Sequence, residues 1–224
     1  MKFYGQRQHD KSLPPPDQTL YERYFKNRAA RGVFLEVGAY DGSTEPNGLF
    51  FERELGWICI NLEPSLPLYR RLCKNRPEAV NLMLALSDRI GISTIWQPQT
   101  PDGRLPGHGT IDAGNIERVK SSREYKSVKP MKVLTITYPD LMEIVGVSVL
   151  NGALLPSIDI FSLDTEGHEL PILSKFWKGM PAAWMPKVIC VETTYAGLDN
   201  LKNILVPLGY KHDHTAFENA YFIR

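Results

Sequence analysis

Acidic side chains stand at or near the end of most apolar runs that could form β-strands. The acids at these positions are Glu36, Asp41, Glu63, Asp88, Asp164, Glu166 and Glu192. Ligands of an open α/β sheet bind outside the carboxyl ends of its strands, so these side chains are expected to surround one site. Clustered carboxylates repel phosphate and attract cations, which points to an ammonium group, a sulfonium or a metal ion.

The loop after the first run has the pattern E-x-G-x-x-D-G, from Glu36 to Gly42. A dinucleotide site would instead need G-x-G-x-x-G and a helix N-terminus for the pyrophosphate. Gly38 and Gly42 would let a ligand approach the backbone closely. S-adenosylmethionine (SAM) carries both an ammonium and a sulfonium. In this interpretation Glu63 accepts the two ribose hydroxyls, and Asp88 accepts a hydrogen bond from the adenine amino group.

The segment D-T-E-G-H-E, residues 164–169, holds candidates for activating an acceptor. An alcohol acceptor needs a base or a metal to remove its proton. His168 titrates near neutrality and could be that base, oriented by Glu166 or Glu192. It could equally cap a helix beginning at Glu169. With Asp164, the same acids could instead ligate Mg²⁺ or Mn²⁺, but we do not favour a metal because holding SAM is a sufficient role for them.

The elements that must position these residues follow an alternating pattern. Strands are predicted at 33–37, 57–62, 79–86, 133–137, 158–163 and 187–191, and helices at 46–55, 65–75 and 139–145. The tail, 209–224, is predicted to form a hairpin with a turn at 217–219. Strands that alternate with helices indicate an α/β fold with a parallel sheet and right-handed crossovers.

Two segments lie outside this pattern. Residues 1–30 are expected to form an N-terminal cap with a short helix through Leu20, Tyr24 and Phe25, and residues 31–224 a single domain. Residues 97–128 are rich in Gly, Pro and charge and predict a long, variable excursion without regular structure. Its bases, Lys120, Arg123, Lys126 and Lys129, fit a solvated surface better than a substrate site.

The composition excludes several classes of protein. The 224 residues include 26 Lys and Arg against 25 Asp and Glu, and 43% are hydrophobic. These values are typical of a globular domain and argue against disorder and against nucleic-acid binding through bulk charge. The three cysteines form no C-x-x-C pair, which disfavours structural zinc. With no apolar run of membrane-spanning length and no signal-like start, we expect a cytoplasmic protein.

Three motifs in this order resemble the FkbM-type family of SAM-dependent methyltransferases. They are GVFLEVGAYDGSTEPNGLFFERELGWICINLEP, SIDIFSLDTEGHELPIL and PKVICVETTY, and QHDK at 8–11 is similar to an element that precedes the core in some members. The resemblance covers residues 30–224. It implies a Rossmann-like class I methyltransferase fold: a mostly parallel seven-stranded sheet with an antiparallel last strand and helices on both faces.

The resemblance also implies roles for individual residues. The methionine end of SAM would contact Glu36, Gly38, Asp41 and Gly42, the ribose Glu63, and the adenine Ser87 and Asp88. Asp164 would lie beside the transferable methyl. Many relatives have Asn at the position of Tyr40.

We therefore expect SAM-dependent O-methylation of a sugar or other hydroxyl, with Asp164, His168, Glu192 and Lys11 as catalytic candidates. Lys11, Asp164 and Glu192 loosely match a Lys–Asp–Lys–Glu tetrad found in some RNA ribose methyltransferases. An RNA 2′-O-methyltransferase and a non-catalytic SAM-binding or adapter module remain the alternatives.

Overall fold

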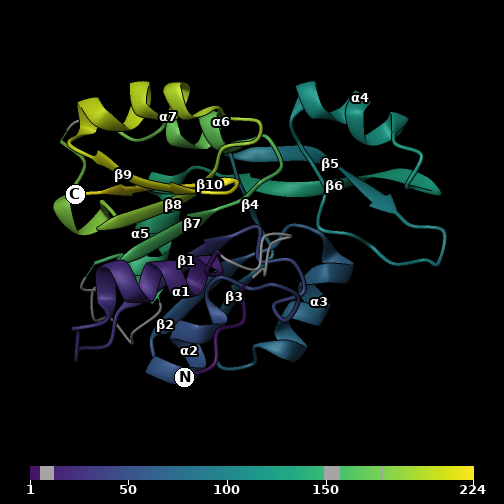
Figure 1. Cartoon of the computed structure of the whole chain (residues 1–224). Coiled ribbons are helices and arrows are strands. Elements are labelled where there is room, and N and C mark those ends of the chain that lie inside the picture. Colours follow the sequence, from purple (N-terminus) through teal and green to yellow (C-terminus); the bar gives the residue numbers. More distant parts are fainter. Residues whose placement is uncertain (6–12, 149–156, 178) are drawn as a thin grey trace.

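The computed structural model of the chain describes residues 1–5, 13–148, 157–177 and 179–224. Its main sheet is built from the strands β1 (Val33–Val37), β2 (Ile58–Leu62), β3 (Val80–Leu82), β7 (Ile160–Leu163), β8 (Val188–Glu192), β9 (Lys211–Ala216) and β10 (Asn219–Ile223). Their order is β3-β2-β1-β7-β8-β10-β9 (Figure 1). The first five strands are parallel, and β10 runs antiparallel to both of its neighbours. The predicted sheet and C-terminal hairpin are confirmed.

The helices that accompany the sheet are α1 (Pro16–Leu20), α2 (Leu49–Leu55), α3 (Leu66–Asn75), α4 (Ala113–Ser121), α5 (Tyr138–Ser148), α6 (Glu169–Leu173) and α7 (Leu198–Leu205). A π-helical turn (Tyr21–Phe25) continues α1, and single 3₁₀ turns occupy Ala182–Trp184 and Val206–Leu208. The predicted helix through Leu20 and Phe25 is confirmed. The helix predicted from residue 46 begins only at Leu49, because the carboxylate of Glu36 holds the backbone N–H groups of Asn47 and Gly48 in a turn.

Alternate residues of the buried strands face two hydrophobic cores, one on each side of the sheet. Leu35 packs in a core with residues of α5, α6 and α7. Phe34, its neighbour in β1, packs in the other core with residues of α1, the π-helical turn and α2. Helices therefore cover both faces, as the continuous apolar runs of β1 and β8 require (Figure 1).

The strand predicted at 79–86 is wrong as a single element. Val80–Leu82 forms β3 beside β2, whereas Ala85–Leu86 forms β4, which pairs with β6 (Ser127–Ile136) in a second sheet. An apolar run of this length is compatible with one strand or two. Here the run forms two strands, because the chain leaves β2 after Leu82 and pairs with β6 from Ala85.

The absence of regular structure predicted for residues 97–128 is also wrong. The segment contains the end of β5 (Gly91–Gln99), all of α4 and the start of β6. β5 and β6 pair in a long antiparallel ladder from Gly91 and Thr135 to Gln99 and Ser127, and β4 completes this second sheet on the far side of β6. We refer to residues 91–136 as the arm, which projects to one side of the main sheet in Figure 1. Its strands are polar because much of their surface is exposed.

No helix within the described ranges is long and apolar enough to cross a membrane.

Candidate active site

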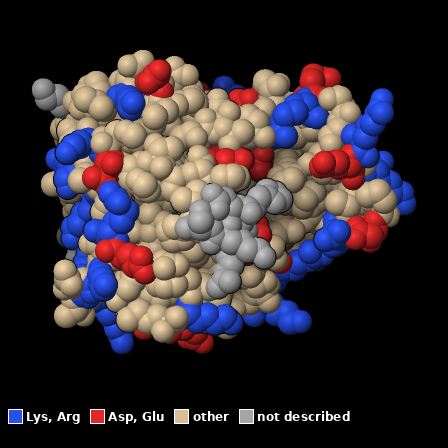
Figure 2. All heavy atoms as spheres, viewed as in Figure 1, with Lys and Arg blue, Asp and Glu red and all other residues tan. Residues whose placement is uncertain are grey.

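A cavity of about 410 Å³ opens at the carboxyl edge of the parallel strands, and the arm forms part of its wall. The strand ends contribute residues 36–40, 63–64, 84–86, 162, 164–166 and 192, and the turn between β9 and β10 contributes 218–219. The arm contributes residues 95, 97, 100, 104, 106–109 and 111. Acidic side chains gather in the middle of the face shown in Figure 2, between the body and the arm.

Gly38 brings the end of β1 against the end of β7. Its φ is +86°, a conformation that favours glycine, and a Cβ there would overlap the backbone carbonyl oxygen of Asp164. The amides of Gly38 and Ala39 both donate to the carbonyl of Leu62 at 3.1 and 3.0 Å, which ties the loop to β2 as well. Gly38 therefore lines the cavity, as predicted, at a point where three strand ends converge.

Glu36 lines the cavity, but its charge is largely used inside the protein. It accepts from the amide of Asn47 at 2.8 Å and pairs with the buried guanidinium of Arg76 at 3.0 Å. Arg76 also pairs with Glu52 at 2.5 Å. Arg76 was not expected from the sequence. The only local sign of its burial is its place four residues after the apolar position Leu72 of α3.

Asp41 and Gly42 are absent from the cavity lining. The Asp41 carboxylate accepts from the amides of Ser43 and Thr44 at 2.9 and 2.7 Å. Partial burial opposes ionisation, but these bonds keep the pKa of Asp41 below its ordinary value. A Cβ on Gly42 would meet Leu72 and Arg76. Both residues shape the loop, and the ligand contacts expected of them remain a prediction.

Glu63 stands at the end of β2 and lines the cavity. Its carboxylate accepts from the amides of Tyr40 at 3.1 Å and Ser65 at 2.8 Å, without a cationic partner among the described residues. Burial raises its pKa to about 8. The Glu63 carboxyl can accept further hydrogen bonds, which suits it to hydroxyl groups such as those of a ribose.

Ser87, Asp88 and His168 form a separate cluster that does not line the cavity. Nε2 of His168 lies 3.0 Å from Oγ of Ser87, which also donates to Asp88 at 3.1 Å. His168 makes no side-chain cap bond to α6, and its burial lowers its pKa. The apolar residues Leu84, Ala85 and Leu86 occupy the corresponding stretch of wall. The adenine contacts expected of Ser87 and Asp88 remain a prediction.

Asp164 and Glu192, from the ends of β7 and β8, bring their carboxyl groups within hydrogen-bonding reach in the cavity. Asp164 is exposed to solvent at the cavity, but desolvation by the surrounding protein and the neighbouring carboxylates, Glu166 foremost, raise its pKa to about 7. Burial and the charge of Asp164 raise the pKa of Glu192 to about 9. Oε2 of Glu192 has no hydrogen-bond partner in the described part of the chain. The pair can therefore hold or accept a proton near neutral pH.

The four residues considered as metal ligands do not converge. Glu166, whose pKa burial raises to about 8, turns to Arg118 at 3.3 Å, and His168 turns to Ser87. Within residues 1–5, 13–148, 157–177 and 179–224, no three His, Cys, Asp or Glu side chains gather in a way that could hold a metal ion. Lys11 and the QHDK segment lie outside the described residues.

The arm is fastened to the site at two places. Thr110 and Asn115 donate to the backbone carbonyl of Glu166 at 2.9 and 2.8 Å, where a Cβ on Gly167 would overlap the Asn115 side chain. The hydroxyl of Tyr40 donates to the carbonyl of Leu105 at 2.6 Å. The sequence analysis did not assign these contacts, because pairings so distant along the chain leave no local signal.

A parallel sheet in this order, an antiparallel strand inserted next to its last position, and a glycine loop with an acid at the next strand end define the Rossmann-like class I methyltransferase fold. The family model of the methyltransferase FkbM domain matches residues 36–216, and the chain belongs to this family.

Among solved structures, the chain is similar to methyltransferase FkbM from Methylobacillus flagellatus KT, with 12% sequence identity and a TM-score of 0.49. The match covers 96% of this chain and 49% of that one, so the chain spans about half its length. A comparison with curated proteins found no significant match.

Proposed function

We propose that the chain is a SAM-dependent methyltransferase that methylates a hydroxyl oxygen. The observation that carries this proposal is the Asp164–Glu192 carboxyl pair, which lies in one cavity with Gly38 and Glu63. Membership of the FkbM methyltransferase family supports the activity. The residues that line the cavity support both SAM as the cofactor and an alcohol as the acceptor.

The cavity fits SAM at three points. Glu63 offers a buried carboxyl with free acceptor capacity for ribose hydroxyls. Gly38 lines the cavity next to Asp164 and places no side chain in it. Asp164 lines the cavity beside other carboxyl groups that raise its pKa, so an ammonium or sulfonium bound there would favour its ionised form. Bound SAM would supply the methyl group as an electrophile.

We assign to Glu192 the removal of the proton from the acceptor hydroxyl. In the ligand-free protein Glu192 is protonated near neutral pH, so it can act as a base only when a positive charge bound beside it lowers its pKa and that proton leaves. Its unpartnered Oε2 can then accept a hydrogen bond from a hydroxyl, and the carboxylate can take the proton as the oxygen becomes nucleophilic. The carboxyl group of Asp164 lies within hydrogen-bonding reach of Glu192, so the two carboxyl groups can share one proton. His168 lies outside the lining, so we assign it no proton transfer.

Calorimetric titration with SAM and with S-adenosylhomocysteine tests cofactor binding. We expect both to bind, and Glu63→Ala to weaken both by about tenfold, since one or two hydrogen bonds to a buried carboxyl are lost. Glu78→Gln is the matched control, because Glu78 is exposed and lies outside the cavity lining. Absence of binding by the wild type would overturn the proposal, and so would unchanged binding by Glu63→Ala.

Turnover is tested separately with methyl-labelled SAM and a panel of alcohols and sugars. We expect transfer to at least one hydroxyl acceptor, with Glu192→Gln lowering kcat by about a hundredfold or more while SAM still binds. SAM binding without transfer to any acceptor would instead indicate a non-catalytic SAM-binding module.

A further inference from the structure

The cavity extends past the positions that we assign to SAM. Glu63 marks one end, at β2, and the other end reaches β8 and the turn between β9 and β10. Asn219 pairs directly with Glu192 across β8 and β10, and Glu218 precedes it in the turn. On the proposed function, on which this inference rests, this far end is where the acceptor must bind, because it lies beyond Asp164.

The far end holds more carboxyl groups than the protein's own cations can neutralise. Asp164, Glu166, Glu192 and Glu218 all line it, and Glu218 helps to raise the pKa of both Asp164 and Glu192. Arg118 pairs with Glu166. Arg104 and His108 reach the cavity from the arm, where Arg104 pairs with Asp102 at 2.6 Å and His108 contacts Tyr125 at 2.5 Å. Of these three basic side chains, only Arg118 is directed at one of the four far-end carboxyl groups.

The side chain of Glu192 gives an independent indication that a hydrogen-bond donor from a ligand belongs in the cavity. Only 9% of the residue is exposed, yet its Oε2 lacks a hydrogen-bond partner although it borders the cavity. Buried carboxylate oxygens are normally satisfied, so an orphan at a cavity wall points to a donor that arrives with the ligand.

We propose that the acceptor is an amino alcohol or amino sugar, whose hydroxyl donates to Glu192 and whose protonated amine lies against Glu218 and Asn219. An ammonium group there compensates the uncancelled carboxylates, whereas a phosphate would be repelled by each of them. The same charge argument disfavours RNA as the acceptor, because its phosphates would face this acidic wall. Glu218 is then the residue that selects the amine.

Ligand-observed NMR on the protein saturated with S-adenosylhomocysteine tests this selection. The probes are glucosamine, glucose and glucose 6-phosphate, and also trans-2-aminocyclohexanol against trans-cyclohexane-1,2-diol. We expect each amine to bind about fivefold or more tightly than its neutral partner, as a partly exposed ion pair allows, and glucose 6-phosphate to bind most weakly. Added NaCl should reduce the preference.

Glu218→Gln should bring the amine and neutral probes close to equal affinity without changing the Kd of S-adenosylhomocysteine, and Glu78→Gln should leave both unchanged. Equal binding of amine and neutral probes by the wild type, no detectable binding of any amine, or tightest binding of glucose 6-phosphate would overturn this inference. Because S-adenosylhomocysteine binding is measured first, its failure identifies a failure of the proposed function itself.

Discussion

Gly38 lies so close to Asp164 that the backbone of Asp164 occupies the position that a Cβ on Gly38 would take. The overlapping atom would be the carbonyl oxygen of Asp164, at the start of the D-T-E-G-H-E segment. This contact joins the loops after β1 and β7, two neighbouring strands whose sequences are more than a hundred residues apart. It sets the position of the Asp164–Glu192 pair relative to the glycine loop.

Gly38→Ala should therefore disrupt both the fold and the site. We expect it to lower the free energy of unfolding by about 2–4 kcal/mol, from the strain of a positive φ and the overlap with backbone, and to abolish S-adenosylhomocysteine binding. Gly179→Ala is the control, because Gly179 has φ +98° with nothing within 4 Å of its Cβ position. Denaturant unfolding and calorimetry measure the two effects. Equal losses in the two variants would show that φ strain alone matters.

Arg76 should be essential to stability, because it neutralises Glu36 and Glu52 where little water reaches. In Arg76→Met both carboxylates lose their cation, and removing one partner of a buried ion pair costs about 3–5 kcal/mol. Lys120→Met, which breaks the exposed pair with Glu117, should cost less than about 0.5 kcal/mol. Urea unfolding compares them, and a cost for Arg76→Met no larger than that of Lys120→Met would contradict this account.

Glu192 should make the ligand-free protein less stable as pH rises. Its pKa is about 9 in the folded state, above its ordinary value, so the folded protein holds a proton that the unfolded chain releases. This contribution is complete below the unfolded pKa and is lost as pH rises through about 9. Thermal unfolding of Glu192→Gln should show a flatter pH dependence between pH 5 and 9. At pH 9 its Tm should be higher by about 2–4 °C, for about 1 kcal/mol in a chain of this size.

The control for that experiment is Glu78→Gln, whose Tm should follow the wild type at every pH. Parallel curves for Glu192→Gln and the wild type would mean that Glu192 ionises in the folded protein as it does in the unfolded chain.

SAM and S-adenosylhomocysteine should respond differently to pH, because only SAM carries a sulfonium. The pKa of Asp164 is about 7, so this carboxyl is mostly protonated at pH 6 and mostly ionised at pH 8. The affinity ratio of SAM to S-adenosylhomocysteine should therefore rise over this range, by up to tenfold per pH unit below the pKa. Calorimetry measures the ratio, and Asp164→Asn should make it independent of pH. A constant ratio in the wild type would place the sulfonium elsewhere.

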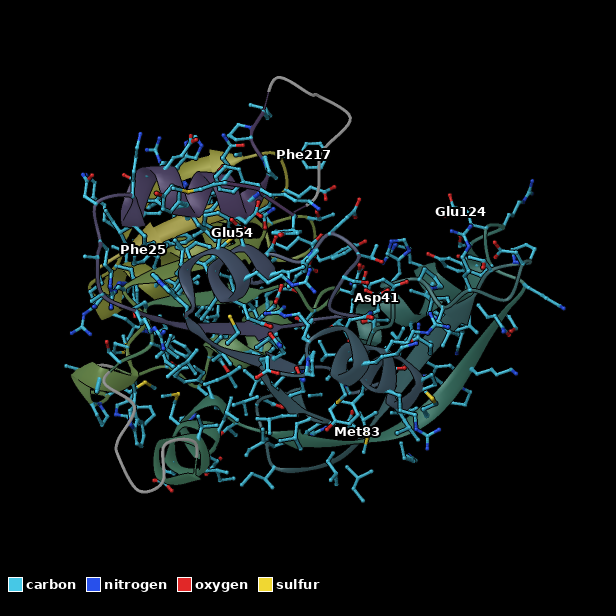
Figure 3. The ribbon with its side chains drawn as sticks, turned by 90° about the horizontal axis from the view of Figure 1, so that it is seen from below. Phe25, Asp41, Glu54, Met83, Glu124 and Phe217 are labelled. Atoms are coloured by element: carbon cyan, nitrogen blue, oxygen red, sulfur yellow. The ribbon has the colours of Figure 1, made fainter. Side chains whose placement is uncertain are left out.

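Tyr40 should fasten the arm over the cavity. Tyr40→Phe removes the hydroxyl that donates to the carbonyl of Leu105, a bond worth about 1 kcal/mol. We expect faster hydrogen exchange in residues 104–109 and faster dissociation of S-adenosylhomocysteine, with little change in Tm. Tyr125→Phe, which removes a hydroxyl contact within the arm, is the comparison. Unchanged exchange in Tyr40→Phe would show that the Tyr40 hydroxyl does not hold the arm and that its contacts with Glu166 are sufficient. Figure 3 shows Glu124 at the outer end of the arm, well away from Asp41.

The local sequence determined the strands of the main sheet and the acids at their ends. Runs such as Val33–Val37 are apolar because a parallel strand is buried on both faces, and Gly38 follows because a positive φ and a close backbone contact exclude a side chain. These requirements act on a few adjacent residues, so they are visible in the sequence. They explain why Glu36, Gly38, Glu63, Asp164 and Glu192 were correctly expected to meet at one edge.

The tertiary structure alone decided which of the acids face the cavity without a cationic partner. Asp41 turns to its own loop, Asp88 to Ser87, and Glu36 to Arg76, which leaves Glu63, Asp164 and Glu192 without cations in the cavity. Each orientation depends on a distant partner or on the arm. The nearly equal counts of acids and bases, 25 and 26, therefore conceal a cavity where carboxyl groups outnumber the cations beside them. Side chains far apart in sequence determine where charge is cancelled.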